Sequence, residues 1–286
     1  MSRVDELFLN LEMVDEGFWQ PREAKHAGSA SEAISYPEGD HDVCFDLEAE
    51  SPWFLHRNRV IGWVAKKHFG YRDVLDVGGG NGAVAYYLES VGFRSLLVEP
   101  GPQGARNAKK RGVRDVIWAQ LSDLKPSSVL KIDVGLFDVV EHIKDDVGFM
   151  KSIGELISQE SSVAITVPAY QALWSDRDVE AGHFRRYNLG SLTTMLEAAG
   201  FQVVYATYFF ALLAPLMHVV SWLKRISGAR SKPESSSENL KSKHRGQHQL
   251  LKVLGICFWL ERQVLKMCRL PFGASIVVVA RKKPRL

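Results

Sequence analysis

Residues 74–85, VLDVGGGNGAVA, constrain the fold more than any other part of the chain. The apolar residues Val74, Leu75 and Val77 predict a short buried strand. Consecutive glycines follow, and small and apolar residues then open a helix. Glycine allows positive φ and a close approach of a ligand to bare backbone, while the helix N-terminus offers unpaired N–H groups. The pattern predicts the first β-α unit of a nucleotide-binding α/β sheet.

Two acids accompany this glycine turn (residues 78–82). Asp76 lies in the first predicted strand, and Glu99 ends the next one, expected over residues 95–98. An acid at the tip of the second strand can accept hydrogen bonds from both hydroxyls of a ribose. Glu99 therefore indicates a ribose but not the rest of the ligand. The alternative is a pair of solvated carboxylates at strand ends.

The glycine spacing separates two classes of nucleotide-binding turn. A dinucleotide turn has G-x-G-x-x-G, whereas Gly78, Gly80 and Gly82 give G-x-G-x-G, with Ala83 at the position of the third dinucleotide glycine. Together with Asp76, the motif D-x-G-x-G-x-G resembles the first motif of the class I S-adenosylmethionine-dependent methyltransferases. The resemblance implies a doubly wound, seven-stranded, mostly parallel α/β sheet. It also implies S-adenosylmethionine as cofactor and S-adenosylhomocysteine as product.

Polar residues recur at the ends of later predicted strands. Gln120 follows a strand over residues 113–119, and Asp138 follows one over residues 132–137. The phrase FDVVEHI, residues 137–143, resembles the corresponding motif of small-molecule and lipid-quinone methyltransferases. Since ligands of open parallel sheets bind at the carboxyl ends of the strands, we expect these residues to converge on one crevice.

The resemblance implies that strand-end residues hold the cofactor. In the family, the turn after the third strand cups the adenine, and Gln120 could bond its exocyclic amine; an ordinary turn residue is the alternative. Gly79 departs from many relatives, which have Cys or Ser there. The implied cofactor contacts are Asp76, Gly78, Gly79, Gly80, Gly82, Glu99, Pro100, Gln120, Leu121, Phe137 and Asp138.

The chain outside this core is expected to form flanking segments. The expected division is a helical cap (1–70), a cofactor-binding core (71–205), a helical insertion (206–274) with a mobile linker near 227–249, and a last strand with a basic tail (275–286). Apolar residues at helical spacing within residues 45–69 predict a helix pair. Arg57 in this pair could meet the methionyl carboxylate of the cofactor, but a surface arginine is the favoured interpretation.

Residues 169–187 are too polar for a core and too aromatic for a linker, so they predict a lid over the reaction site. Residues 182–187, GHFRRY, resemble a branch of methyltransferases often met in glycan and natural-product pathways. We expect Trp174, Arg185, Arg186 and Tyr187 to contact the acceptor. The two arginines would clamp a phosphate or a carboxylate.

Methyl transfer needs few catalytic groups, because the enzyme mainly aligns donor and acceptor and removes a proton from a hydroxyl acceptor. His142 and His183 are the candidate bases, since histidine titrates near neutrality. Either could instead be structural, His142 by orienting Glu141 or by capping the next helix. No set of His, Asp and Glu has recognisable ligand spacing, so no metal is expected.

The net charge of +3 is unevenly distributed. Residues 221–286 hold fifteen Lys and Arg against three Glu, which gives +12 and leaves −9 for the remainder. Such a basic region suits anionic lipid, a phosphate-bearing substrate or nucleic acid, or it only solubilises the surface. Residues 209–223 are too short and interrupted to span a bilayer, and residues 250–267 predict an amphipathic helix. These two segments either lie on a membrane or wall the acceptor pocket.

The three cysteines lack disulfide or metal spacing, and the N-terminus lacks a signal-peptide pattern. Both observations favour a cytoplasmic protein, which could also associate with a membrane. The predicted reaction is methyl transfer to an O or N of a small-molecule, sugar or lipid-linked acceptor. No nucleic-acid partner is expected, because an N/D-P-P-[YF] signature is missing after the fourth strand. The alternatives are an NAD(P)-dependent oxidoreductase and a non-catalytic membrane-surface protein.

Overall fold

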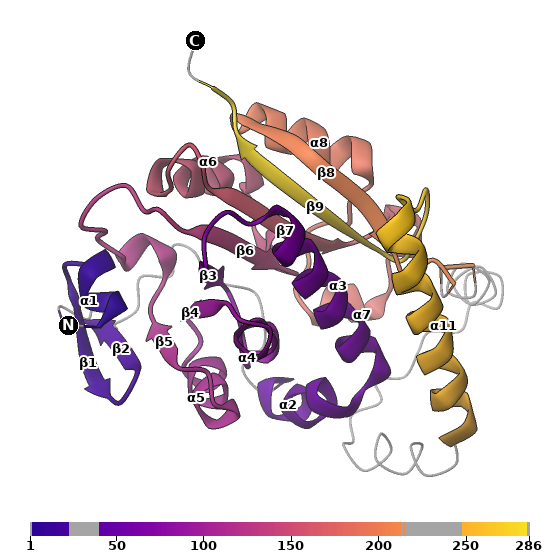
Figure 1. Cartoon of the computed structure of the whole chain (residues 1–286), viewed down its shortest axis with the longest axis horizontal. Coiled ribbons are helices and arrows are strands. Elements are labelled where there is room, and N and C mark those ends of the chain that lie inside the picture. The colour runs from indigo at the N-terminus through magenta and orange to yellow at the C-terminus, as the bar shows by residue number, and fades with distance from the viewer. Residues whose placement is uncertain (1, 23–39, 213, 216–247, 285–286) are drawn as a thin grey trace.

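The computed structural model describes residues 2–22, 40–212, 214–215 and 248–284, and a nine-stranded sheet runs through its centre (Figure 1). The strand order is β1-β2-β5-β4-β3-β6-β7-β9-β8. The strands are β1 (Leu11–Asp15), β2 (Phe18–Pro21), β3 (Asp73–Val77), β4 (Arg94–Glu99), β5 (Asp115–Trp118), β6 (Asp133–Phe137), β7 (Ser162–Pro168), β8 (Phe201–Phe209) and β9 (Ser275–Lys282).

Five central strands, β5-β4-β3-β6-β7, are parallel, and β9 pairs antiparallel with both β7 and β8. The chain builds outward from β3 through β4 to β5 and then returns to place β6 on the other side of β3. This reversal is the topological switch point, and in open α/β sheets ligands bind in the crevice beyond the carboxyl ends of the strands at such a point. The expected doubly wound, mostly parallel α/β class is confirmed.

The strand count and part of the expected N-terminal helical cap are wrong. Residues within the first 22 form the β1–β2 hairpin, and β2 adds to the sheet edge in parallel with β5. Gly17, with φ of +64°, makes the turn, and a Cβ there would lie 1.9 Å from the carbonyl oxygen of Arg114. Trp19 of β2 is buried, so this hairpin extends the sheet from seven strands to nine.

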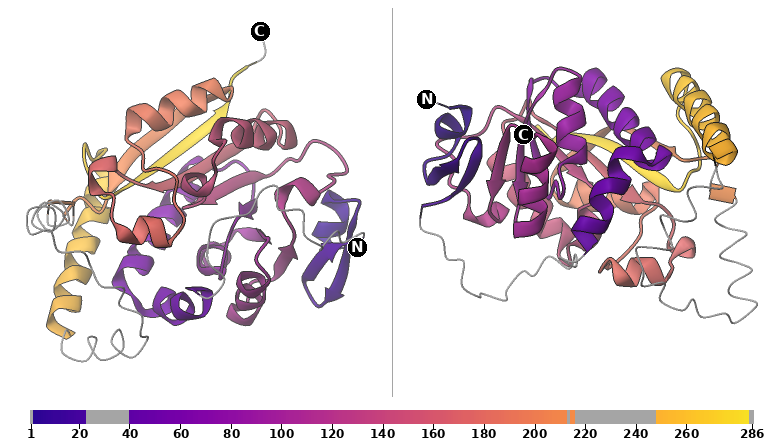
Figure 2. Two further views of the ribbon diagram at one scale, coloured as in Figure 1. Left: turned by 180° about the vertical axis from the view of Figure 1, so that it is seen from behind. Right: turned by 90° about the horizontal axis from the view of Figure 1, so that it is seen from below.

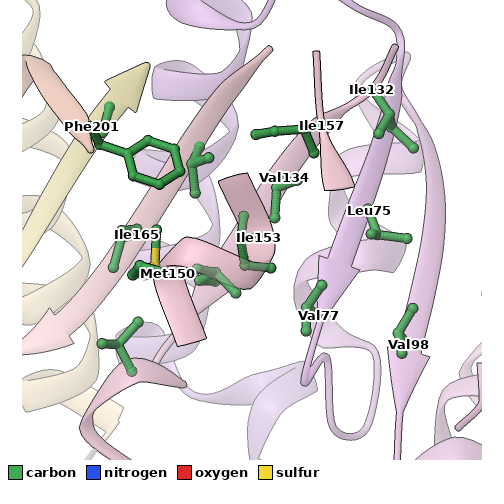
Figure 3. Packing of buried hydrophobic residues seen from close by; sticks show 14 of the residues in the cluster. Leu75, Val77, Val98, Ile132, Val134, Met150, Ile153, Ile157, Ile165 and Phe201 are labelled. Atoms are coloured by element: carbon green, nitrogen blue, oxygen red, sulfur yellow. The ribbon is translucent and has the colours of Figure 1, made fainter. Parts of the chain in front are cut away.

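Helices cover both faces of the sheet (Figures 1 and 2). Successive side chains along a strand point to opposite faces of the sheet, so each strand contributes to the hydrophobic core on both faces. Leu75 and Val77 pack with α6 (Asp146–Leu156) and α8 (Leu189–Ala198) on one face, as Figure 3 shows in part. Val74 packs on the other face with α3 (Pro52–His68) and α4 (Ala83–Ser90). Beside these, α5 (Pro102–Arg111) covers β4 and β5.

The expected helix pair before β3 is present as α2 (Asp40–Glu50) and α3. The expected amphipathic helix is also present, as α11 (His248–Met267), and it lies against α3. Its Glu261 accepts hydrogen bonds from the backbone N–H groups of Phe210 and Ala211, both at 2.7 Å. His56 of α3 joins the same carboxylate at 2.9 Å, which ties α11 to the end of β8.

Most of the expected linker and part of the apolar segment 209–223 lie outside the described residues. Of the helices that the structure describes, none combines the length and apolar character needed to cross a bilayer. The division into domains stays a prediction.

Ile153 of α6 tests the core that supports the crevice, because its side chain is fully buried (Figure 3). We expect Ile153→Ala to lower the free energy of unfolding by about 2–5 kcal/mol through lost burial and a residual cavity. Val129→Ala, at a side chain 58% exposed, should change it by less than about 0.5 kcal/mol. Denaturant titration of both variants is the measurement, and equal effects would contradict this packing.

Candidate active site

The glycine turn connects the carboxyl end of β3 to the first residue of α4. Gly78, Gly80 and Gly82 all have positive φ, and Gly82 is the N-cap of α4 at +75°. A Cβ on Gly79 would lie 2.7 Å from the side chain of Leu97 and 3.0 Å from a carboxylate oxygen of Asp76. The backbone of the turn thus runs close over β3 and β4, and the N–H groups of Gly78 and Gly82 are bonded within the protein to the carbonyl oxygens of Val98 and Gly79.

Glu99 at the end of β4 is fastened to the glycine turn. Its two carboxylate oxygens accept hydrogen bonds from the N–H groups of Gly80, at 2.8 Å, and Gly101, at 2.7 Å. Burial raises the pKa of Glu99 to about 7, although the two hydrogen bonds favour the charged form and act in the opposite direction. Each oxygen keeps acceptor capacity for a further donor such as a ribose hydroxyl.

Asp76 lies beneath the turn and is almost completely buried. Neither of its carboxylate oxygens accepts a hydrogen bond from another described residue. Burial raises the pKa of Asp76 to about 7, and the nearby Glu99 carboxylate adds to this while Arg57 opposes it. A buried carboxylate without donors is costly, so this position suits a cationic or hydrogen-bonding ligand group.

Arg57 is a correction to the sequence analysis, because it is buried rather than on the surface. Its guanidinium pairs with Asp138 at 2.6 Å and donates to the carbonyl oxygen of Phe137 at 3.0 Å. Thr166 donates to the other oxygen of Asp138 at 3.0 Å. These contacts hold Asp138 at φ of +59°, just beyond β6. The sequence could not reveal this pairing, because it joins α3 to a strand end far along the chain.

The remaining expected cofactor residues lie at the ends of β4 and β5. Gln120 follows β5 with an exposed side chain, and Leu121 begins the short helix η1 (Leu121–Asp123). Trp118 donates its indole N–H to the carbonyl oxygen of Pro100 at 3.1 Å, joining the two strand ends. The carboxyl ends of β3, β4, β5 and β6 therefore line one side of the sheet, as expected from their parallel pairing.

Two histidines expected to act as bases come together although they are far apart in sequence. His142 ends the short helix η2 (Val140–His142), and His183 lies in residues 169–187, the predicted lid, which is called the lid below. Their ring centroids are 4.6 Å apart, with an interplanar angle of 80°. Burial, with the neighbouring His183, lowers the pKa of His142 to about 4, so its ring is neutral at pH 7.

Glu141 belongs to the same group, and sequence reasoning gave it no role of its own. It is completely buried, and its ligand atoms and those of the two histidines all lie within 4.8 Å of one another. Burial and the nearby Asp138 raise the pKa of Glu141 well above its usual range. The search for metal-ligand spacing along the sequence did not find this group, because His183 comes from the lid and is far from Glu141 and His142 in the chain.

Asp178 organises the lid from α7 (Asp176–Glu180) and was also missed. Its carboxylate accepts from Nδ1 of His183 at 2.8 Å and from Nε and Nη2 of Arg186 at 2.7 and 2.9 Å. Although burial opposes ionisation, these bonds hold the pKa of Asp178 well below its usual range. The lid also contacts η2 directly, through the Phe184 N–H and the carbonyl oxygen of Glu141 at 2.8 Å.

The expected acceptor contacts in the lid have internal partners. Arg185 pairs with Asp146 at 2.6 Å, and Tyr187 donates its hydroxyl to the same carboxylate at 2.7 Å. Because Arg186 is similarly held by Asp178, an anion clamp would require both arginines to leave carboxylates. Trp174 is half-buried after the short helix η3 (Gln171–Leu173). Contacts of these residues with an acceptor stay a prediction.

Asp76→Asn tests the buried carboxylate through the pH dependence of folding. The folded state holds the Asp76 proton more tightly than the unfolded chain, so this stability contribution is largest below pH 4 and is lost as pH rises towards 7. We expect the unfolding free energy of Asp76→Asn, relative to wild type, to increase between pH 4 and 7 by up to about 1.4 kcal/mol per pH unit. Denaturant titrations across this range measure it, and a constant difference would contradict it.

Comparison with known proteins identifies relatives of this site-bearing core. Residues 49–206 match a family model described as a methyltransferase domain. A probable S-adenosylmethionine-dependent methyltransferase of Mycobacterium tuberculosis is 27% identical over 179 residues, covering 61% of this chain and 64% of the relative. One from Mycolicibacterium smegmatis is 28% identical over 161 residues, covering 55% of this chain and 62% of the relative. The chain thus spans less than two thirds of the length of these relatives.

Solved structures share the fold at low sequence identity. Phosphoethanolamine N-methyltransferase 2 of Haemonchus contortus, solved with S-adenosyl-L-methionine, is 16% identical with a TM-score of 0.54, covering 88% of this chain and 59% of that one. The plantazolicin methyltransferase BamL is 15% identical with a TM-score of 0.51, covering 89% and 97%. The expected Rossmann-like methyltransferase fold class is confirmed. With a family model matching more than half of its length, the chain belongs to the methyltransferase-domain family.

Proposed function

We propose that this protein is an S-adenosylmethionine-dependent methyltransferase whose cofactor binds at the carboxyl ends of β3 to β6. The observation that carries the proposal is the connection between the ends of β3 and β4, where the Glu99 carboxylate accepts a hydrogen bond from the N–H of Gly80 in the glycine turn. This hydrogen bond holds a carboxylate suited to a ribose beside the glycine backbone, which a ligand can approach closely. Membership of the methyltransferase-domain family supports the same assignment.

The residues present fit this cofactor. Glu99 retains acceptor capacity for the ribose hydroxyls, and Asp76 is a buried carboxylate with unpartnered oxygens that suits a cationic ligand. The glycine turn, Gln120 and Leu121 would complete the contacts at neighbouring strand ends. The bound cofactor supplies an electrophilic methyl group on its sulfonium. The protein orients the acceptor and excludes water.

The proposed acceptor is an O or N of a small molecule, a sugar or a lipid-linked compound. Two proteins of the same fold are named as methyltransferases of phosphoethanolamine and of plantazolicin, and acceptors of that kind support the proposal. His142 is neutral at pH 7, but with its pKa lowered to about 4 it would accept a proton from an acceptor hydroxyl only weakly. His183, oriented by Asp178, lies beside it in the lid.

Calorimetric titration with S-adenosylhomocysteine tests the cofactor and its site together. We expect micromolar binding by the wild type and at least tenfold weaker binding by Glu99→Ala, because the ribose hydroxyls lose their hydrogen-bond acceptor. Glu155→Gln, at an exposed position of α6, should bind like the wild type. Preference for NAD over S-adenosylhomocysteine would favour the oxidoreductase alternative and reject the proposal.

We further propose that the protein works at the cytoplasmic surface of an anionic membrane, which it contacts through α11. Phe258 and Leu265 of this helix are buried, whereas its outer face leaves large apolar side chains 41–86% exposed. They recur at helical spacing and form one stripe: Ile256, Trp259, Leu260, Val264 and Met267. The exposed cations Lys266 and Arg269 flank this stripe, which favours anionic lipid as its partner. Three free cysteines support the reducing compartment.

Vesicle flotation tests this contact. Wild-type protein should float with phosphatidylglycerol vesicles and less with phosphatidylcholine vesicles, because apolar insertion and charge act together. The double variant Trp259→Glu and Met267→Glu should bind several-fold more weakly, and Val129→Glu, exposed elsewhere, should not change binding. Equal flotation of all three proteins would show that α11 is not the contact.

A further inference from the structure

The group formed by Glu141, His142 and His183 has the composition of a metal site, and we call it the Glu-His-His cluster. Its three side chains each offer a ligand atom, and these atoms all lie within 4.8 Å of one another. Two residues come from η2 and the third from the lid. The cluster lies close to Asp138, the residue that follows the end of β6.

Each histidine has a hydrogen-bond partner of the kind that orients metal-bound histidines. Nδ1 of His183 contacts the carboxylate of Asp178 at 2.8 Å, and Asp178 is in turn bound by Arg186. His142 bonds the backbone carbonyl of Ala181. A histidine that ligates a metal typically donates its second ring N–H to a carboxylate or a carbonyl, which sets the ring orientation.

Glu141 is the independent observation that points to a cation. Its side chain is completely buried, and neither carboxylate oxygen accepts a hydrogen bond from another described residue. Such a group is costly unless it is protonated or bound to a positive partner. Among the described residues, the cations that act on Glu141 are Arg57 and Arg186, and each is engaged with another carboxylate, Asp138 and Asp178 respectively.

We propose that Glu141, His142 and His183 bind one divalent transition-metal cation. Two imidazoles and one carboxylate suit Mn²⁺, Fe²⁺, Co²⁺ or Zn²⁺ better than Mg²⁺ or Ca²⁺, which prefer oxygen ligands. Three protein ligands leave coordination positions open. An oxygen of the methyl acceptor takes one of them, and this second part rests on the proposed methyltransferase function. Asp178, which orients His183, would then link the conformation of the lid to binding of the acceptor at the metal.

Cobalt is the probe, because its visible absorption reports the ligands directly. Full-length protein treated with chelator should bind one Co²⁺ per chain with micromolar affinity. Glu141→Gln, which preserves shape, and His183→Ala should each weaken binding at least tenfold and alter the spectrum. Asp178→Asn, in a positioning residue, should weaken it about 10- to 100-fold. His68→Gln, at a half-buried histidine outside the cluster, should bind like the wild type.

Titration of the same samples with S-adenosylhomocysteine separates the two proposals and reports folding. Cofactor binding without stoichiometric Co²⁺ binding would overturn the metal site and leave the methyltransferase proposal intact. Co²⁺ binding lost in both cluster variants, without cofactor binding by the wild type, would support the metal site and reject the methyltransferase proposal. Unchanged Co²⁺ affinity in Glu141→Gln and His183→Ala would also overturn the metal site, and would leave Glu141 as a buried protonated acid.

Discussion

The hydrogen bond from Gly80 N–H to the Glu99 carboxylate connects the two halves of the proposed cofactor site. It exists because β3 and β4 are parallel neighbours in register, which brings their carboxyl ends together. The second oxygen of Glu99 holds Gly101, so one side chain positions both the glycine turn and the start of α5. Its elevated pKa follows from burial, and the two N–H donors partly compensate for the cost of the charge.

Carboxylates organise the acceptor side in the same manner. Asp138 is held by Arg57 and Thr166, Asp146 by Arg185 and Tyr187, and Asp178 by Arg186 and His183. Asp76 and Glu141 differ, since they are buried and their oxygens find no donor among the described residues. Both lie near the carboxyl ends of the central strands, Asp76 in β3 beneath the glycine turn and Glu141 beyond β6. Buried groups of this kind mark places where a ligand completes the structure.

Local patterns predicted the core well because they depend on neighbours in sequence. The apolar runs of β3, β6 and β7, the glycine turn and the helix pair α2–α3 follow from periodicity and from backbone requirements. The β1–β2 hairpin was missed, since its outer strand is mostly exposed and carries no strong alternation. The buried position of Arg57 was missed because its partners belong to β6 and the residue after it.

The sequence by itself determined the parallel α/β core, the D-x-G-x-G-x-G turn and the acid at the end of β4, because each is a property of a short continuous segment. Tertiary structure alone decided which side chains meet. It brought His183 of the lid to Glu141 and His142, assigned Arg185 and Arg186 to internal carboxylates, and added two strands to the sheet edge. The physical reason is that such contacts depend on how separate elements pack, and spacing along the chain carries no record of a partner dozens of residues away.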